Sequence, residues 1–338
     1  MTRHIPRESS TPVWLRRFTK LVAASTLFLI FAGAMVTSTG SGLAVPDWPL
    51  SYGMLMPPMV AGIFYEHGHR MIATTVGLLT IIQAIWLQRR EPKRFVRLLG
   101  WWSLAAVIAQ GLLGGLTVIF LLPQAVSVSH AAMAEIFFAI NIAIAFFTSR
   151  WFERLRAESR EPRAGSVSGL TTLLAAAAFV QIFLGAVMRH LGAGLAIPDF
   201  PLSFGRIIPP IETAGVAANF SHRVGAVVVT TLIIMLAVRV FRSGPSALRK
   251  PVAALCAIVC VQIYLGARVV WDASENVRIY HSLAGEEAVR HATVTSVHVM
   301  TGAATFALAV LVALAARCHS ERREESGWAG ARSSEVPA

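Results

Sequence analysis

Long apolar segments alternate along the chain with short polar segments that are rich in basic or turn-forming residues. Each apolar segment is close to the length of about 20 residues that an α-helix needs to cross a bilayer core of about 30 Å. The pattern predicts eight membrane-spanning helices, near residues 18–38, 70–88, 99–122, 126–148, 169–189, 221–240, 250–271 and 293–316. The first segment lacks a small-residue cleavage site, so we interpret it as a retained helix rather than a signal peptide.

The polar segments reveal an internal repeat. Gly42-Leu-Ala-Val-Pro-Asp47-Trp-Pro-Leu-Ser-Tyr-Gly53 recurs 152 residues later as Gly194-Leu-Ala-Ile-Pro-Asp199-Phe-Pro-Leu-Ser-Phe-Gly205. At the same offset Gln110-x-x-x-Gly114 matches Gln262-x-x-x-Gly266. Four spans per repeat is an even number, so both halves have the same orientation and a pseudo-two-fold axis along the membrane normal relates them. The predicted fold class is an all-α integral membrane protein built of two four-helix bundles.

The repeat predicts five parts of the chain. They are a cytoplasmic N-terminal segment (1–17), a first four-helix half (18–150), a cytoplasmic linker (151–168), a second four-helix half (169–316) and a disordered cytoplasmic tail (317–338). The last outward loop, from Asp272 to Arg290, is longer than its counterpart in the first half and contains His281. We therefore expect the halves to differ most at this loop.

Composition supports a membrane protein and explains its charge. Hydrophobic residues make up 55% of the 338 residues and charged residues only 14%, whereas ordinary soluble domains are about one quarter charged. The net charge of +12 would suit a nucleic-acid-binding protein, but most basic residues lie in the two terminal segments and in alternate loops. The positive-inside rule places these parts in the cytoplasm. The basicity is thus topological, and the repeated loops with Asp47 and Asp199, which we expect to cap turns, face outward.

One histidine lies near the outward end of every second span: His69, His130, His222 and His298. An ionisable side chain within a membrane span indicates function by default, and neutral imidazole is a common axial ligand of heme iron. Arg70 and Arg223 follow two of these histidines and suit heme propionates. Three alternatives stay open: helix-packing hydrogen bonds, a zinc or copper site, and arginines that simply extend to the membrane surface.

The two halves differ in one polar residue beside the histidines. Glu66 precedes His69 by three residues, whereas Asn219 precedes His222. A carboxylate at one site alone predicts acid or proton chemistry in the first half, with Glu66 as the catalytic residue, and cofactor binding in the second. The alternative is an exposed carboxylate at a loop end. Glu135 in the fourth span is a second candidate for a buried carboxylate, which a helix-packing hydrogen bond would also explain.

The common depth of the four histidines separates two functions. A cytochrome that moves electrons across the bilayer needs hemes near opposite faces, whereas these residues would hold two hemes side by side near the outward surface. This favours chemistry at one face. The remaining outward histidines are expected not to be ligands: His67, His190, His281 and His291.

Together these residues resemble the heme A synthase family of cytochrome oxidase assembly enzymes in bacteria and mitochondria. The resemblance covers about residues 15–316 and is carried by Thr39 to Leu50, by Glu66-x-x-His69-Arg70 and by the single histidines of the later spans. It implies oxidation of the C8 methyl group of heme O to a formyl group, through successive hydroxylations and loss of water from a geminal diol. It further implies a substrate heme site formed by His69, His130 and Arg70, a heme b site formed by His222, His298 and Arg223, and Glu66 as the carboxylate near the substrate.

The resemblance also implies partners and a location. A heme O synthase, which is a protoheme farnesyltransferase, would supply the substrate, and a cytochrome oxidase would receive the product, in the bacterial inner membrane. The electron donor, the oxygen source and a homo-oligomeric state stay open. Many bacterial members carry a cysteine pair in the first outward loop, where this chain has Val45 and Ser51, so a disulfide-linked handover is excluded.

Two other functions compete with this one. A diheme b-type membrane cytochrome would hold two b hemes tightly and produce no altered porphyrin. A non-catalytic heme carrier would need the histidines but would tolerate Glu66→Gln. A transporter is disfavoured, because no series of ionisable residues crosses the middle of the membrane.

Overall fold

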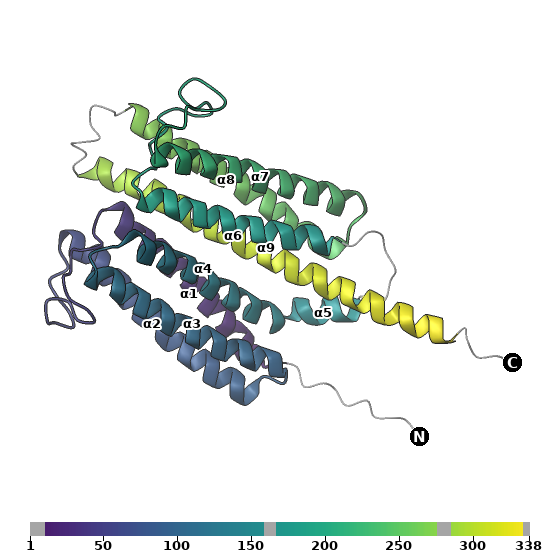
Figure 1. Ribbon diagram of the computed structural model, residues 1–338. Helices are drawn as coiled ribbons and strands as arrows, with labels where there is room; N and C mark the ends of the chain where they lie inside the picture. The colour runs from purple at the N-terminus through teal and green to yellow at the C-terminus, as the bar shows by residue number, and fades with distance from the viewer. Residues whose placement is uncertain (1–10, 159–166, 276–284, 334–338) are drawn as a thin grey trace.

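The computed structural model describes residues 11–158, 167–275 and 285–333, and this part of the chain is helical (Figure 1). Its helices are α1 (Val13–Ser38), α2 (Ala61–Arg90), α3 (Arg94–Ile119), α4 (Gln124–Phe147), α5 (Arg150–Glu158), α6 (Ser168–His190), α7 (Ala214–Ser243), α8 (Ser246–Glu275) and α9 (Glu286–Ser333). All except α5 are long and apolar enough to cross a membrane. The eight predicted spans and the all-α membrane fold class are confirmed.

The helices form two groups that lie side by side. Figure 1 shows α1 to α4 in one group and α6 to α9 in the other. The last helix, α9, packs against α8 of its own group and also against α1 of the other group. The start of α1 and the end of α9 lie at the same end of the molecule. This arrangement is consistent with the predicted pseudo-two-fold axis.

Each of the eight spanning helices begins earlier than the apolar pattern predicts, α2 by nine residues and α7 by seven. The predicted spans start at residues 70 and 221, but α2 starts at Ala61 and α7 at Ala214. The additional turns mix small and polar residues, so hydropathy alone does not detect them. The side chain of Thr213 accepts a hydrogen bond from the Val216 N–H (3.2 Å) and thereby caps α7. Glu66 and His69 consequently lie inside α2 and have fixed directions relative to one another.

The parts outside the bundles also differ from the predicted pattern. The short helix α5 lies where a linker is predicted, and its apolar residues Phe152 and Leu155 are buried. The backbone of α9 continues to Ser333, although composition predicts disorder from residue 317; the segment contains Ala, Glu and Arg, which favour helix. Residues 1–10, 334–338 and 276–284, with His281, lie outside the described residues.

Both bundles have mainly apolar interiors. A large apolar cluster of the second half includes residues of α6 to α9 and extends to Phe146 of α4 and to α5. In the interior of the first half, Asn141 Oδ1 accepts hydrogen bonds from Gln83 (2.8 Å) and Ser103 (3.1 Å), and all three side chains are buried. Such bonds stabilise helix packing in apolar surroundings. They join α2, α3 and α4 below the histidines.

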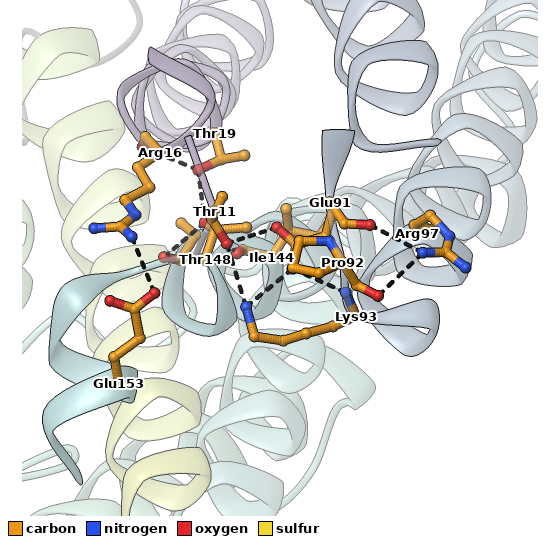
Figure 2. Close-up of polar contacts among 11 residues, drawn as sticks. Thr11, Arg16, Thr19, Glu91, Pro92, Lys93, Arg97, Ile144, Thr148 and Glu153 are labelled. Atoms are coloured by element: carbon orange, nitrogen blue, oxygen red, sulfur yellow. Dashed lines mark hydrogen bonds and ion pairs between the residues drawn. The ribbon is translucent and has the colours of Figure 1, made fainter. Parts of the chain in front are cut away.

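A second polar network closes the end of the first half that lies opposite the histidines (Figure 2). Thr11 donates a hydrogen bond of 2.6 Å to the buried Glu91, which also pairs with Lys93 at 2.9 Å. Arg16 on α1 pairs with Glu153 on α5 at 3.0 Å. These contacts attach the start of α1 to the α2–α3 turn and to α5. The bundle is therefore fixed at this end, while the other end carries the candidate site.

Candidate active site

Each of the four predicted histidines packs against a glycine of the preceding helix. The pairs are Gly33 with His69, Gly114 with His130, Gly185 with His222, and Gly266 with His298. A Cβ atom added to any of these glycines would lie 2.9 to 3.1 Å from Cε1 of the facing imidazole, closer than Cβ atoms ordinarily approach other atoms. The absent side chain thus makes room for the ring.

The two histidines of the second half face each other. The ring centres of His222 on α7 and His298 on α9 are 6.5 Å apart. Two metal–imidazole bonds of about 2 Å on opposite sides of one metal, together with the ring radii, require a separation of roughly 6 Å. Nδ1 of His298 lies 3.1 Å from the main-chain oxygen of Gln262 and donates to it, so Nε2 carries the lone pair. This pair fits the two axial positions of one heme iron.

The histidines of the first half occupy the matching places of the repeat. His69 lies on α2 and His130 on α4, and each packs on its glycine. Gln110 on α3 places its amide nitrogen 3.3 Å from Nε2 of His130. Nδ1 of His69 is buried without a hydrogen-bond partner. The pairing of His69 with His130 at one heme stays a prediction.

The donor groups fit heme better than a bare metal ion. Nowhere in the described part of the chain do three His, Cys, Asp or Glu side chains gather into a metal-binding group. Zinc and copper sites of proteins ordinarily use three or four such ligands. A heme iron needs only one or two axial nitrogens from the protein, because the porphyrin supplies the others. The paired imidazoles and their glycines meet that requirement.

Glu66 is a buried carboxylate, since only 3% of the residue is exposed. Its Oε1 pairs with Arg70 at 2.5 Å and its Oε2 accepts a hydrogen bond of 2.8 Å from the Val45 N–H. Asn219 occupies the same place in the second half, where it donates to main-chain oxygens of the outward loop and accepts from Arg223. The alternative of an exposed carboxylate at a loop end is wrong. The catalytic role of Glu66 stays a prediction.

Arg70 and Arg223 bind the outward loops, which are residues 39–60 and 191–213. Arg70 donates to the main-chain oxygens of Asp47 (2.7 Å) and Leu50 (2.9 Å). Arg223 does the same with Asp199 (2.8 Å) and the carbonyl three residues later (2.9 Å). Each arginine therefore fastens a loop to the helix that carries the histidine. Binding of heme propionates by these arginines stays a prediction.

The aspartates of the loops cap turns, as expected. Asp47 accepts hydrogen bonds from the N–H groups of Tyr52 (2.6 Å) and Gly53 (2.8 Å). The bond from Gly53 is the main cause that holds the pKa of Asp47 below its ordinary value of 3.8. For Asp199, slight burial raises the pKa, but the N–H of Gly205 and its neighbour outweigh this and keep the value below 3.8. Both carboxylates thus stabilise their loops in the ionised form.

Several polar contacts could not be anticipated from the pattern. His67 is buried on α2, and its Nδ1 lies 2.8 Å from Ser51 Oγ. The only sequence signal is that Phe220 occupies the matching place in the second half. Glu135 is buried on α4, and its Oε2 has no partner. His190 ends α6 and His291 lies in the first turns of α9; neither is one of the four histidines that pack on glycines.

The sequence is similar to those of known proteins over most of its length. The sequence pattern of a family described as "Cytochrome oxidase assembly protein" matches residues 59–286. The heme A synthase of Shouchella clausii is 28% identical over 293 residues, which are 80% of this chain and 91% of that protein. The heme A synthase of Symbiobacterium thermophilum is 32% identical over 66% of this chain and 74% of that protein. The heme A synthase of Halalkalibacterium halodurans is also 32% identical, with the same coverage.

The matched region contains both histidine–arginine pairs, Glu66 and the second outward loop. The match covers well over half of the chain and agrees with the eight membrane-spanning helices. The chain belongs to the cytochrome oxidase assembly protein family.

Proposed function

We propose that this protein is a heme A synthase, which oxidises the C8 methyl group of heme O to a formyl group and so provides heme A for cytochrome oxidase assembly. The first half, residues 18–150, takes the substrate heme between His69 and His130. The second half, residues 169–316, holds a heme b between His222 and His298. The names of the relatives, the facing imidazoles of His222 and His298 and the glycines behind all four histidines support this assignment.

The observation that carries the proposal is the difference between two otherwise matched sites. Each site has two histidines that pack against glycines of a neighbouring helix. Each also has an arginine that donates hydrogen bonds to main-chain oxygens of the outward loop. Only the first has a carboxylate, Glu66, where the second has Asn219. A site for electron transfer alone does not need a proton acceptor, whereas oxidation of a methyl group releases protons. The carboxylate therefore marks the half in which chemistry occurs.

The residues of the chain divide the work. His69 and His130 bind and orient the substrate. Glu66, held by Arg70 and by the Val45 N–H, accepts a proton at a carboxylate oxygen. The outward loops limit the access of water from above. A heme b held by His222 and His298 would supply one-electron redox chemistry beside this site.

The decisive experiment is extraction of total heme from a host that makes heme O, with and without this protein. Chromatography and mass spectrometry then identify the hemes. We expect a formyl heme with the wild type and none with His69→Ala, because that variant lacks a substrate ligand. Unchanged heme O beside protein-bound heme b would instead support a diheme cytochrome or a carrier.

We also infer the orientation and the partners. The end at which α1 begins and α9 ends carries the basic segments, which supports cytoplasmic termini in a bacterial inner membrane. The candidate sites then lie near the outward face. A heme O synthase is the partner that would supply the substrate. Fusion reporters at residue 338 and in the loop near residue 55 test the orientation.

A further inference from the structure

A cavity with a basic lining lies between the start of α1 and the short helix α5, at the end of the molecule opposite the histidines. Its volume is about 530 Å³, and sites for small molecules usually enclose about 300–1,000 Å³. Three arginines and one glutamate line it: Arg16 of α1, and Arg150, Glu153 and Arg154 of α5. None of these residues belongs to the candidate active site.

The packing of α5 directs its charged side chains toward the cavity. Arg150, Glu153 and Arg154 are spaced by three and four residues, so they share one face of the helix. Phe152 and Leu155 are buried in the apolar cluster that also contains residues of α9. Because this apolar face is fixed, the charged face has a fixed direction as well, and it lies toward the start of α1.

The positive charges of the cavity exceed its negative charge. Arg16 donates a hydrogen bond of 3.0 Å to Glu153, as Figure 2 shows. This pair uses the one carboxylate among the described lining residues, and in the described part of the chain no ion pair involves Arg150 or Arg154. Like charges that share a site repel one another. An anionic ligand would relieve this repulsion.

Arg16 also has a hydrogen-bond donor that no described protein group uses. Its side chain is only 11% exposed, and its Nε is buried without a partner, while Glu153 accepts from another nitrogen of the same guanidinium group. A buried donor without an acceptor is unfavourable. Phosphate oxygens are strong acceptors for guanidinium donors. A phosphate bound beside Arg16 would supply the missing acceptor.

The surroundings of the cavity suit a lipid better than a free ion. Pro12, Val13 and Ala157 add apolar groups to its lining, which a free phosphate ion would not use. Trp14, on the same turn of α1 as Val13, is 69% exposed. Exposed tryptophans of membrane-spanning helices are typical of the level of the lipid headgroups. Basic cavities at this level bind the headgroups of anionic lipids.

We propose that this cavity binds the phosphate headgroup of an anionic phospholipid through Arg16, Arg150 and Arg154. The bound lipid connects the start of α1 to α5 and so stabilises the junction between the first half and the segment that leads to the second. The inference does not depend on the proposed function, because the cavity and the four histidines lie at opposite ends of the molecule.

The test compares two double variants of the full chain, purified in detergent. Arg150→Gln with Arg154→Gln removes two charges from the cavity and leaves the ion pair of Arg16 intact. Arg89→Gln with Arg90→Gln is the matched control, because these arginines are exposed at the end of α2 and do not line the cavity. Native mass spectrometry measures the binding of dioleoylphosphatidylglycerol, with zwitterionic dioleoylphosphatidylcholine for comparison. We expect the affinity for phosphatidylglycerol to fall about 10- to 30-fold in the cavity variant and to match that of the wild type in the control.

A single variant tests the buried donor of Arg16. Arg16→Lys keeps a positive charge near Glu153 but lacks the Nε–H group. We expect this variant to bind phosphatidylglycerol more weakly than the wild type does. Unchanged affinity in both Arg16→Lys and the cavity variant would overturn the inference.

Thermal unfolding distinguishes the lipid from free phosphate. A ligand that binds the folded state raises the unfolding midpoint, so phosphatidylglycerol should raise it in the wild type and in the control but not in the cavity variant. Inorganic phosphate at the same concentration should have no such effect. Equal stabilisation by inorganic phosphate would overturn the lipid as the ligand, and equal loss of affinity in both double variants would reduce the cavity to general surface charge. Absence of heme A formation by the wild type would overturn the proposed function and leave these lipid measurements unaffected.

Discussion

At the scale of single residues, the site depends on imidazoles that lie against bare backbone. Four glycines occur where a side chain would meet Cε1 of a histidine. Glycine is otherwise unfavourable within a helix by roughly 0.5–1 kcal/mol relative to alanine. Glycine recurs at all four matched positions in spite of this cost in helix stability, which indicates that the space left by the absent side chain is needed. The space allows an imidazole ring to lie between two helices.

Alanine at Gly33 or Gly185 should therefore displace an imidazole. Crowding of this kind ordinarily costs about 1–3 kcal/mol, and we expect Gly33→Ala to weaken binding of heme O and Gly185→Ala to reduce bound heme b. The heme-to-protein ratio after purification measures both effects. Gly111→Ala is the control, since a Cβ there has no neighbour within 4 Å, and it should retain full heme content. Equal heme content in all three variants would contradict the role of the glycines.

Removal of the charge of Glu66 should separate chemistry from binding. In Glu66→Gln the side chain still accepts a hydrogen bond from the Val45 N–H, but it cannot accept a proton. We expect heme A formation to fall about 10²- to 10⁴-fold, with heme b content unchanged. Extracted hemes are quantified by chromatography. Full heme A formation by Glu66→Gln would show that Glu66 is not the catalytic residue.

At the scale of elements, each outward loop is stabilised by hydrogen bonds within the loop and by hydrogen bonds from the helix that follows it. The aspartate of the loop binds two N–H groups of its own turn, and an arginine from the following helix binds main-chain oxygens of the same loop. The second half repeats both contacts with Asp199 and Arg223. The loops are thus ordered structures that belong to α2 and α7.

The contribution of Asp47 should depend on pH in one direction. Its pKa is below the ordinary value of 3.8, chiefly because of the Gly53 N–H. The folded state therefore binds the proton less well, so the stabilisation is complete above about pH 4 and is lost as the pH falls through the lower, folded pKa. Hydrogen exchange of residues 39–60, corrected for intrinsic pH effects, measures it. Asp47→Asn should be less protected at neutral pH, and Asp199→Asn should leave this first loop unchanged.

The elements also show how far the sequence leads. Apolar length and the repeat predict eight spans and the two pairs of histidines, because both follow from composition at fixed spacing. The apolar pattern misses the first turns of α2 and α7, because these turns contain polar residues although their backbone is helical. The pattern also misses the contact of Gln181 with His222 and that of His67 with Ser51. Both contacts depend on how neighbouring elements are rotated relative to one another, and no local sequence pattern contains this information.

At the scale of the whole molecule, one partly buried arginine joins the two halves. Arg189 on α6 donates to the main-chain oxygen of Ala34 (2.8 Å) and to Ser38 Oγ (2.5 Å), both on α1. Ser38 is also 2.9 Å from Ser296 on α9. The matching position of the first half, 152 residues earlier, is Thr37. The junction is therefore asymmetric, although the halves arose from one pattern.

Arg189→Met should loosen this junction. The variant keeps much of the length but leaves the acceptors on α1 without their donor, which ordinarily costs about 1–3 kcal/mol. We expect a lower midpoint of thermal unfolding in detergent. Arg239→Met is the control, because Arg239 is exposed on α7 and should unfold like the wild type. Identical midpoints for both variants would show that Arg189 does not hold the halves together.

The fastening of the outward loops has a mechanical consequence. His69 and Arg70 are consecutive, as are His222 and Arg223, so the imidazole and the arginine that binds the loop share one helical turn in each half. A loop cannot move away without breaking the hydrogen bonds of this arginine or displacing the turn, and the turn cannot rotate without moving the imidazole. A spectroscopic probe placed on a loop would consequently report on the position of the imidazole beneath it.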